Sequence, residues 1–202
     1  MKKSGRNSLL LRFLILALIV SPGFTNHASA GTLDSVSHIH HVKVVEKKVL
    51  VLTHEGLYEL VGENDIKLVG KDKIDVMGLT SLGKVLVASG HPAQGSKMPN
   101  PIGLVRSTDG GSSWKAVSLV GKVDFHSLEG AGSELYGADS QSGNLLYSSD
   151  TGKTWRSLGT NTFTDIAVSP NMPEMAVALK DSKLLLTEDA FKSTKELKNN
   201  FK

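Results

Sequence analysis

The stretch Ser107-Thr108-Asp109-Gly110-Gly111-Ser112-Ser113-Trp114 occurs a second time, as Ser148-Ser149-Asp150-Thr151-Gly152-Lys153-Thr154-Trp155. Both copies read Ser-x-Asp-x-Gly-x-Ser/Thr-Trp, and their aspartates are 41 residues apart. An aspartate that opens a tight turn accepts hydrogen bonds from nearby backbone amides, and the glycine adopts a positive φ at little cost. The tryptophan then packs its large apolar face into a core. Each copy therefore predicts a rigid β-hairpin corner, with a structural role for Ser107, Asp109, Gly111, Trp114, Ser148, Asp150, Gly152 and Trp155.

Short apolar runs surround these corners in four units with a period near 40 residues. The units cover residues of about 35–70, 71–118, 119–158 and 159–202. The fourth unit keeps a decayed motif in which Asp189 is retained and Phe191 replaces the glycine, and the first unit has no copy. Evenly spaced short strands with one motif per unit are typical of a propeller. We therefore expect an all-β propeller of about four blade-like units, and the sequence leaves open whether the ring is complete or truncated.

The repeated motif resembles the Asp-box, or BNR repeat, of sialidases and other secreted β-propellers, where it occurs on enzymes and non-enzymes alike. Longer strings are similar to a group of secreted bacterial BNR-repeat proteins labelled glycosyl-hydrolase-like. These strings include His38-Ile39-His40, Thr53-His54-Glu55-Gly56-Leu57, Gly90-His91-Pro92 and Asp124-Phe125-His126-Ser127-Leu128. The resemblance covers most of residues 36–190 and implies the propeller fold. Its hydrolase label rests on the boxes and implies little about activity.

Residues 1–30 have the pattern of a secretory signal peptide. Four basic residues precede and flank the apolar run 13–20, and Ala28-Ser29-Ala30 supplies small residues for cleavage before Gly31. The run is too short for a permanent membrane span, so none is expected after cleavage. The sequence thus predicts a secreted or extracytoplasmic protein.

The composition of residues 31–202 narrows the classes of partner. Four of the 23 Lys and Arg residues lie in the signal, which leaves 19 against 20 acidic residues, a net charge of −1. This balance gives no basic footprint for nucleic acid. The chain has no cysteine, so packing rather than disulfides must stabilise the fold.

Histidines and aspartates near the start of each unit are the candidate ligand or metal residues. Aligning the units places His40, Met77, His126 and Asp165 at one position, and His38, Asp75 and Asp124 two residues earlier. The innermost strands of a propeller line its channel, and alternate residues share a face, so these side chains are expected to converge near the axis. Histidine with carboxylate is a transition-metal ligand set, whereas a hydrogen-bonded polar channel is the alternative. His54 is interpreted as a turn residue that forms hydrogen bonds.

The insert at residues 90–101, which contains His91, three prolines and two glycines, is a second candidate site. Long loops on a rigid scaffold often carry function, although a loop without function fits the composition equally well.

Two classes of enzyme, sialidases and other glycoside hydrolases, can be compared with the residues that this chain contains. The resemblance to sialidases implies a cluster of three arginines for that activity, and residues 31–202 contain only Arg106 and Arg156. A true sialidase is therefore not expected. Other glycoside hydrolysis needs two carboxylates at a set separation, for which Asp75, Asp124 and Asp165 are available. No catalytic residue is therefore assigned.

Three functions follow as hypotheses. The first is an extracytoplasmic binding module, with the His/Asp-lined axis or the 90–101 loop as its site and a glycan, small ligand or metal as ligand. The second is a glycosyl-hydrolase-like enzyme acting on envelope or extracellular glycans. The third is an assembly factor that binds a protein partner. An incomplete ring would expose a strand edge through which chains could oligomerise.

Overall fold

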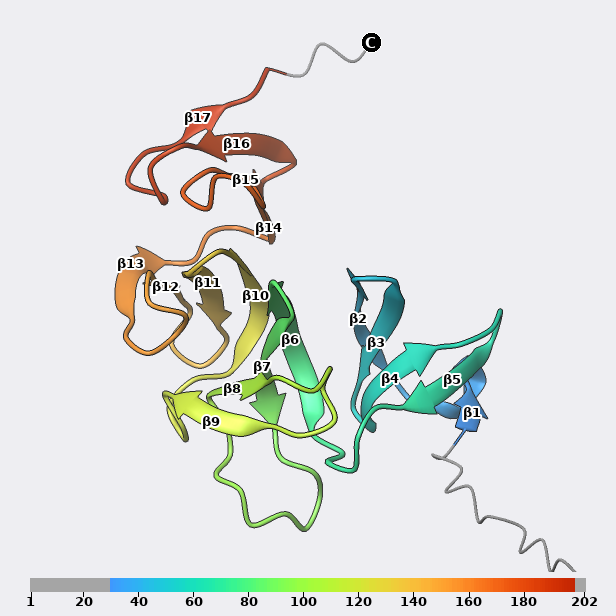
Figure 1. Ribbon diagram of the computed structural model, residues 1–202. Helices are drawn as coiled ribbons and strands as arrows, with labels where there is room; N and C mark the ends of the chain where they lie inside the picture. Colours follow the sequence, from blue (N-terminus) through green and yellow to red (C-terminus); the bar gives the residue numbers. More distant parts are fainter. Residues whose placement is uncertain (1–29, 199–202) are drawn as a thin grey trace, which may run out of the picture.

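The computed structural model describes residues 30–198, which form four antiparallel sheets arranged as the blades of a β-propeller (Figure 1). Blade 1 comprises β1 (Ala30–Thr32), β2 (Ile39–Val45), β3 (Lys48–Thr53), β4 (Gly56–Leu60) and β5 (Asp65–Leu68), with the 3-10 helix η1 (Leu33–Ser35) after β1. Blade 2 comprises β6 (Asp75–Leu82), β7 (Val85–His91), β8 (Leu104–Ser107) and β9 (Lys115–Ser118). Blade 3 comprises β10 (Phe125–Ala131), β11 (Glu134–Asp139), β12 (Asn144–Ser148) and β13 (Arg156–Thr160). Blade 4 comprises β14 (Asp165–Val168), β15 (Ala176–Lys180), β16 (Lys183–Thr187) and β17 (Lys195–Glu196).

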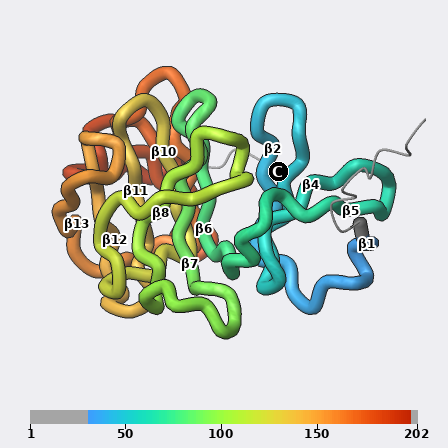
Figure 2. The backbone as a smooth tube through the Cα atoms, turned by 60° about the horizontal axis from the view of Figure 1, so that its bottom comes forward, coloured from blue at the N-terminus to red at the C-terminus, as the bar shows by residue number. Residues whose placement is uncertain are grey.

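The blades follow one another in chain order, and their first long strands lie innermost. Strand β6 contacts β2 on one side and β10 on the other, and β10 in turn contacts β14. Blades 1 and 4 consequently lie at the two ends of the series, as the blue-to-red colouring of Figures 1 and 2 shows. Within the described part of the chain, no helix is both long enough and apolar enough to cross a bilayer. The expected all-β propeller with four blades is confirmed.

Each interface between consecutive blades, called a seam here, contains its own apolar core. The seam of blades 1 and 2 buries Leu52 and Leu57 against Val76, and Trp114 packs at its margin. The other two seams follow the same plan, with residues such as Leu104 and Phe125 between blades 2 and 3, and Tyr136 and Ile166 between blades 3 and 4. Burial of apolar surface at these seams is what holds the sheets together.

The eight-residue motif closes its turn with the same hydrogen bonds in both copies. In the first copy the Gly111 amide donates to Ser107 Oγ at 2.8 Å, and the Ser113 amide donates to Asp109 Oδ1 at 2.9 Å. The second copy repeats these bonds at 2.9 Å each, from Gly152 to Ser148 and from Thr154 to Asp150. The motif glycine also lies against the preceding blade, because a Cβ on Gly111 would meet Leu57 Cδ2 of blade 1 at 2.7 Å. The motif therefore forms a corner and fits one blade to the next.

The decayed copy in blade 4 keeps this hydrogen bonding without its glycine. The Phe191 amide donates to Thr187 Oγ1 at 2.9 Å, and the Ser193 amide donates to Asp189 Oδ1 at 2.9 Å. Phe191 adopts a φ of 61°, in the left-handed region where the equivalent Gly111 has 91°. This conformation is unfavourable for a bulky residue. The Phe191 ring compensates by packing against Tyr136 and Phe163, with centroid distances of 5.5 and 5.1 Å.

Hydrogen bonding in the motif lowers the pKa of both aspartates. The Ser113 hydroxyl, followed by the Ser107 hydroxyl, lowers the pKa of Asp109 from 3.8 to about 2. The Thr154 backbone amide and hydroxyl do the same for Asp150, whose pKa is also about 2. A carboxylate whose pKa is lower in the folded state than in the unfolded state stabilises the fold above the unfolded pKa. That contribution is lost as the pH falls from about 4 toward 2.

We expect the variant Asp150→Asn to lose less stability on acidification than the wild type does. Asparagine keeps an oxygen that accepts the Thr154 amide but does not titrate. The unfolding free energy of both proteins, measured by urea denaturation at a series of pH values between about 4 and 2, will therefore fall less steeply for the variant. Equal slopes would show that Asp150 is not coupled to folding.

A β-bulge interrupts the innermost strand at the same position in three blades. Register shifts lie between Ile39 and His41 in β2, between Val76 and Gly78 in β6, and between Phe125 and Ser127 in β10. The extra residues are therefore His40, Met77 and His126. A bulge turns its side chain away from the direction that strict alternation would give, which decides where these histidines point.

Candidate functional site: two histidine–aspartate clusters at the blade seams

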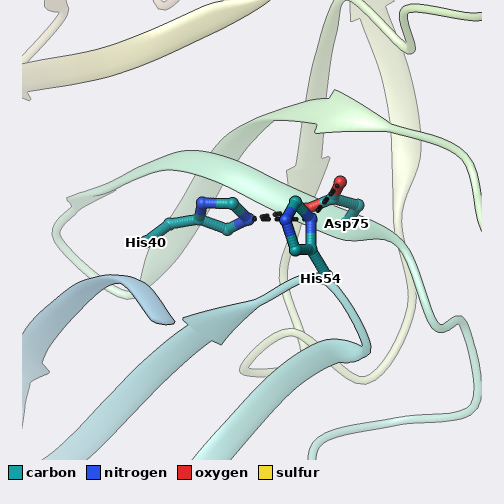
Figure 3. A group of neighbouring side chains, drawn as sticks. All are labelled: His40, His54 and Asp75. Carbon is teal, nitrogen blue, oxygen red and sulfur yellow. Dashed lines mark hydrogen bonds and ion pairs between the residues drawn. The ribbon is translucent and has the colours of Figure 1, made fainter. Parts of the chain in front are cut away.

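The first cluster consists of His40, His54 and Asp75 and spans the seam of blades 1 and 2. His40 Nε2 lies 2.9 Å from Asp75 Oδ1, and His54 Nδ1 lies 2.9 Å from Asp75 Oδ2. The two ring nitrogens are 3.2 Å apart. Figure 3 shows both imidazoles pointing toward the carboxylate. Two imidazole nitrogens of blade 1 and the two oxygens of one carboxylate of blade 2 thus lie together.

Local structure explains each position in the first cluster. His40 is the bulge residue of β2, His54 lies in the turn between β3 and β4, and Asp75 is the first residue of β6. The side chain of His40 is 6% exposed and that of Asp75 is 17% exposed, whereas His54 is 49% exposed. The cluster is therefore closed toward the seam and open on the side of His54.

Burial lowers the pKa of His40 below 6.5, and the Asp75 carboxylate opposes this shift only in part. At neutral pH the ring is consequently uncharged, which is the form that binds a metal ion. The His38 ring lies beside the cluster, with centroid distances of 4.9 Å to His40 and 5.2 Å to His54. A third imidazole is thus close to the open side.

The second cluster consists of His91, Asp124 and His126 and spans the seam of blades 2 and 3. Asp124 Oδ2 lies 2.8 Å from His126 Nε2 and 3.3 Å from His91 Nε2. Asp124 is buried, whereas the side chains of His126 and His91 are 49% and 32% exposed. In each of the two clusters, the ligand atoms lie within 4.8 Å of one another.

The two clusters occupy equivalent places in consecutive blades. Thr53 in blade 1 and Gly90 in blade 2 are equivalent, because each pairs with the residue just before the bulge, Ile39 or Val76. The residues that follow them, His54 and His91, are therefore equivalent too. Each of these histidines faces an aspartate of the next blade, Asp75 or Asp124. The other histidine of each cluster comes from a different side of the seam. It is His40, the bulge residue of blade 1, in the first cluster, and His126, the bulge residue of blade 3, in the second. In blade 2 the bulge residue is Met77, an apolar side chain.

The axis is lined by a set of side chains that shares His126 with the second cluster. A cavity of about 150 Å³ is lined by His41, Lys43, His126, Glu129 and Asp165, among others. Lys43 forms an ion pair with Glu129 across this cavity, from blade 1 to blade 3. Burial raises the pKa of Glu129, although Lys43 opposes that shift. His41 Nε2 lies 3.2 Å from the backbone oxygen of His126.

The structure thus divides the residues that were expected to converge on the axis. His40 and Asp75 belong to the first cluster with His38 at its edge, and Asp124 and His126 belong to the second. Of the expected residues, His126 and Asp165 line the axial cavity. The bulges place His40 against Asp75 and His126 against Asp124, while His126 still borders the axial cavity. The loop residue His91 joins the second cluster, and the expected structural residues of the motif lie in turns away from both.

His54 is the cluster residue that the sequence does not identify as a candidate ligand. It lies in the turn after β3 and forms a hydrogen bond with Asp75, which agrees with its interpretation as a turn residue that forms hydrogen bonds. The available signal was the recurrence of a histidine after the second strand of units 1 and 2, at positions 54 and 91. Aligning those strand ends as well as the strand starts would have identified the pair.

The donor set and spacing of the first cluster fit a divalent transition metal. Zinc is bound by histidine nitrogen and carboxylate oxygen at about 2.0–2.2 Å, which places tetrahedral ligand atoms about 3.3–3.6 Å apart. The observed separations of 2.9 to 3.2 Å would need to open by a few tenths of an ångström. Two imidazoles and a carboxylate leave one tetrahedral position for water, substrate or His38.

Comparison with solved structures shows the fold. The chain superimposes on an ancestral GH74 enzyme with a TM-score of 0.55 and 13% identity, covering 82% of this chain and 25% of that one. It superimposes on YCF48 bound to D1 peptide with a TM-score of 0.55 and 16% identity, covering 83% of this chain and 57% of that one. The chain therefore spans about a quarter and just over half of the length of these two β-propellers. No protein-family model and no curated protein sequence matches it.

Proposed function

We propose that this protein is an exported Asp-box β-propeller that acts as an extracytoplasmic binding module, with a divalent transition-metal ion as its ligand. The ion is held at the seam of blades 1 and 2 by His40, His54 and Asp75. The signal-like pattern of residues 1–30 supports export, and the two copies of the motif at 107–114 and 148–155 support the Asp-box assignment.

The observation that carries the proposal is the convergence of two imidazole nitrogens and a carboxylate within 3.2 Å of one another. The nitrogens come from residues 14 positions apart, and the carboxylate comes from the next blade. Histidine nitrogen favours zinc, copper, nickel or iron, whereas calcium and magnesium prefer sites made of oxygen alone. Because the pKa of His40 is lowered, its ring is in the neutral form, which is the form that binds a metal ion.

A glycan hydrolase has weaker support from the geometry. The likeness to a GH74 enzyme is at 13% identity and concerns the fold. Glu129 and Asp165 both line the axial cavity, but Glu129 is paired with Lys43. A volume of about 150 Å³ is also below the roughly 300 Å³ at which ligand pockets usually begin. For metal binding, in contrast, the ligand groups His40, His54 and Asp75 already lie in contact with one another.

A protein partner is the second candidate, because strand β2 exposes apolar side chains. Val42 and Val44 are 56% and 73% exposed, and Ile39 near the bulge is 42% exposed. Apolar side chains that lie exposed together on one strand are a candidate contact surface for another molecule. The YCF48 on which the chain superimposes is bound to D1 peptide, which supports a peptide or protein as a partner of this fold.

The proposal is tested by metal analysis of the full chain, purified without a histidine tag from a host that exports it. After exposure to zinc and removal of free metal, we expect elemental analysis to find bound zinc in the wild type and in the control variant His41→Ala. The double variant His40→Ala/His54→Ala should lose the zinc of this site. Calcium and magnesium should not be retained. Zinc retention equal to wild type in the double variant would overturn the proposal.

Export is tested on the same preparation. N-terminal sequencing of the protein recovered outside the cytoplasm should begin at Gly31. Recovery of the intact chain inside the cytoplasm would contradict export without affecting the metal site.

A further inference from the structure

We infer that a second, separate transition-metal site lies at the seam of blades 2 and 3, formed by His91, Asp124 and His126. This inference goes beyond the proposed function, because it rests on other residues and would stand if the first cluster bound nothing. Three observations carry it: an incompletely partnered buried carboxylate, a histidine whose free nitrogen faces that carboxylate, and the equivalence of the two seams.

The Asp124 carboxylate is buried without a permanent positive charge beside it. The residue is 3% exposed, and its ion-pair partners within residues 30–198 are His91 and His126. Its Oδ2 also accepts a hydrogen bond from Ser140 Oγ at 2.8 Å, whereas its buried Oδ1 has no hydrogen-bond partner in the described part of the chain. Burying a charged carboxylate is costly unless a cation compensates it. A cation held by Asp124 and its two histidine neighbours would compensate this charge.

His91 is oriented to present a lone pair to that carboxylate. Its Nδ1 lies 2.8 Å from Asn100 Oδ1, and an amide oxygen only accepts, so Nδ1 carries the proton. In a neutral ring Nε2 is then a bare acceptor, and it lies 3.3 Å from Asp124 Oδ2. The two atoms attract each other when a positively charged group, a metal ion or a proton on Nε2, lies between them. At metal sites a histidine usually binds the metal with one ring nitrogen and donates the N–H of the other ring nitrogen to an oxygen atom.

The Asn100 contact also connects this site to the loop that the sequence singled out. His91 ends β7, and Asn100 lies near the far end of the same insert, so their contact joins the two ends of the loop. A metal bound by His91 and Asp124 would fasten this loop to blade 3. The site would thus couple metal binding to the position of the loop at residues 92–99.

Zinc binding by the full chain distinguishes the two clusters when one exposed histidine is removed from each. We expect about two zinc equivalents for the wild type and for His41→Ala, and about one for either His54→Ala or His91→Ala. The double variant His54→Ala/His91→Ala should retain none. Cobalt(II), bound in place of zinc, reports the same sites by visible absorption without any assay of activity. Far-UV circular dichroism confirms that each variant is folded.

The outcomes separate the two claims. If His91→Ala leaves the zinc count unchanged while His54→Ala lowers it, the second site is overturned and the proposed function stands. If His91→Ala lowers the count while His54→Ala does not, the second site stands and the proposed function fails. The variant Asn100→Ala, which removes the partner of His91 and no ligand, should weaken binding at this site by about 10-fold at an unchanged count. Unchanged affinity in Asn100→Ala would overturn the role given to the tautomer.

Discussion

Replacing Asp75 with asparagine is expected to weaken zinc binding at the first cluster by at least about 100-fold. Asp75 supplies the one negative charge of that cluster and contacts both His40 and His54 at 2.9 Å. Loss of a group that merely orients a ligand costs about 10- to 100-fold in affinity, so loss of a direct anionic ligand should cost at least the upper end of that range. Asparagine has nearly the same shape, so the effect reports charge and coordination rather than packing.

The affinity is best measured by competition with a chromophoric chelator in a background that carries His91→Ala, so that the second cluster does not contribute. The matched control is Asp165→Asn, which neutralises a carboxylate of the axial cavity that belongs to neither cluster. We expect the control to bind zinc as the parent does. Equal affinities for Asp75→Asn and its parent would show that the carboxylate is not a ligand.

The substitution Gly152→Ala is expected to lower the unfolding free energy by about 3 kcal/mol. Gly152 adopts a φ of 83°, which costs an alanine about 1–2 kcal/mol. The added Cβ would also overlap Leu104 of blade 2 and approach Leu135 Cδ1 to 3.1 Å. Overpacking of a filled core costs about 1–3 kcal/mol more. Together these terms shift the folding equilibrium by about 100-fold.

Gly143→Ala is the matched control, because Gly143 adopts a φ of 69° and has no heavy atom within 4 Å of the position a Cβ would take. It carries the backbone cost without the overlap and should lose only about 1 kcal/mol. Urea denaturation of both variants gives the difference directly. Similar losses in the two would show that the seam at Gly152 has room for a methyl group, contrary to the packing described here.

The architecture was accessible from the sequence because the signals that define it are local. The Ser107–Asp109–Gly111 turn closes within five residues, and Ser148–Asp150–Gly152 repeats it. Alternating apolar runs between the corners then predicted the strands of each blade. Even the decayed copy at Asp189 kept its hydrogen bonds, so the loss of its glycine did not change the unit.

The candidate site was accessible only in part. Aligning the units brought His40 and His126 to one position, and the structure places both at that position, as bulge residues. The alignment assigned both side chains to the axis, and of the two only His126 lines the axial cavity, whereas His40 meets Asp75 at the seam. The axial cavity is also lined by His41 and Glu129, which were not among the candidate residues.

By itself, the sequence determined the all-β class, the four blades and the hydrogen-bonded corners, because each depends on residues a few positions apart. Only the tertiary structure decided which histidine meets which aspartate. His54 reaches Asp75, and His91 reaches Asp124, across seams that exist only when two blades pack together. The physical reason is that blade packing and the bulges in β2 and β10 fix the direction of these side chains, and neither is encoded by the spacing of the residues along the chain.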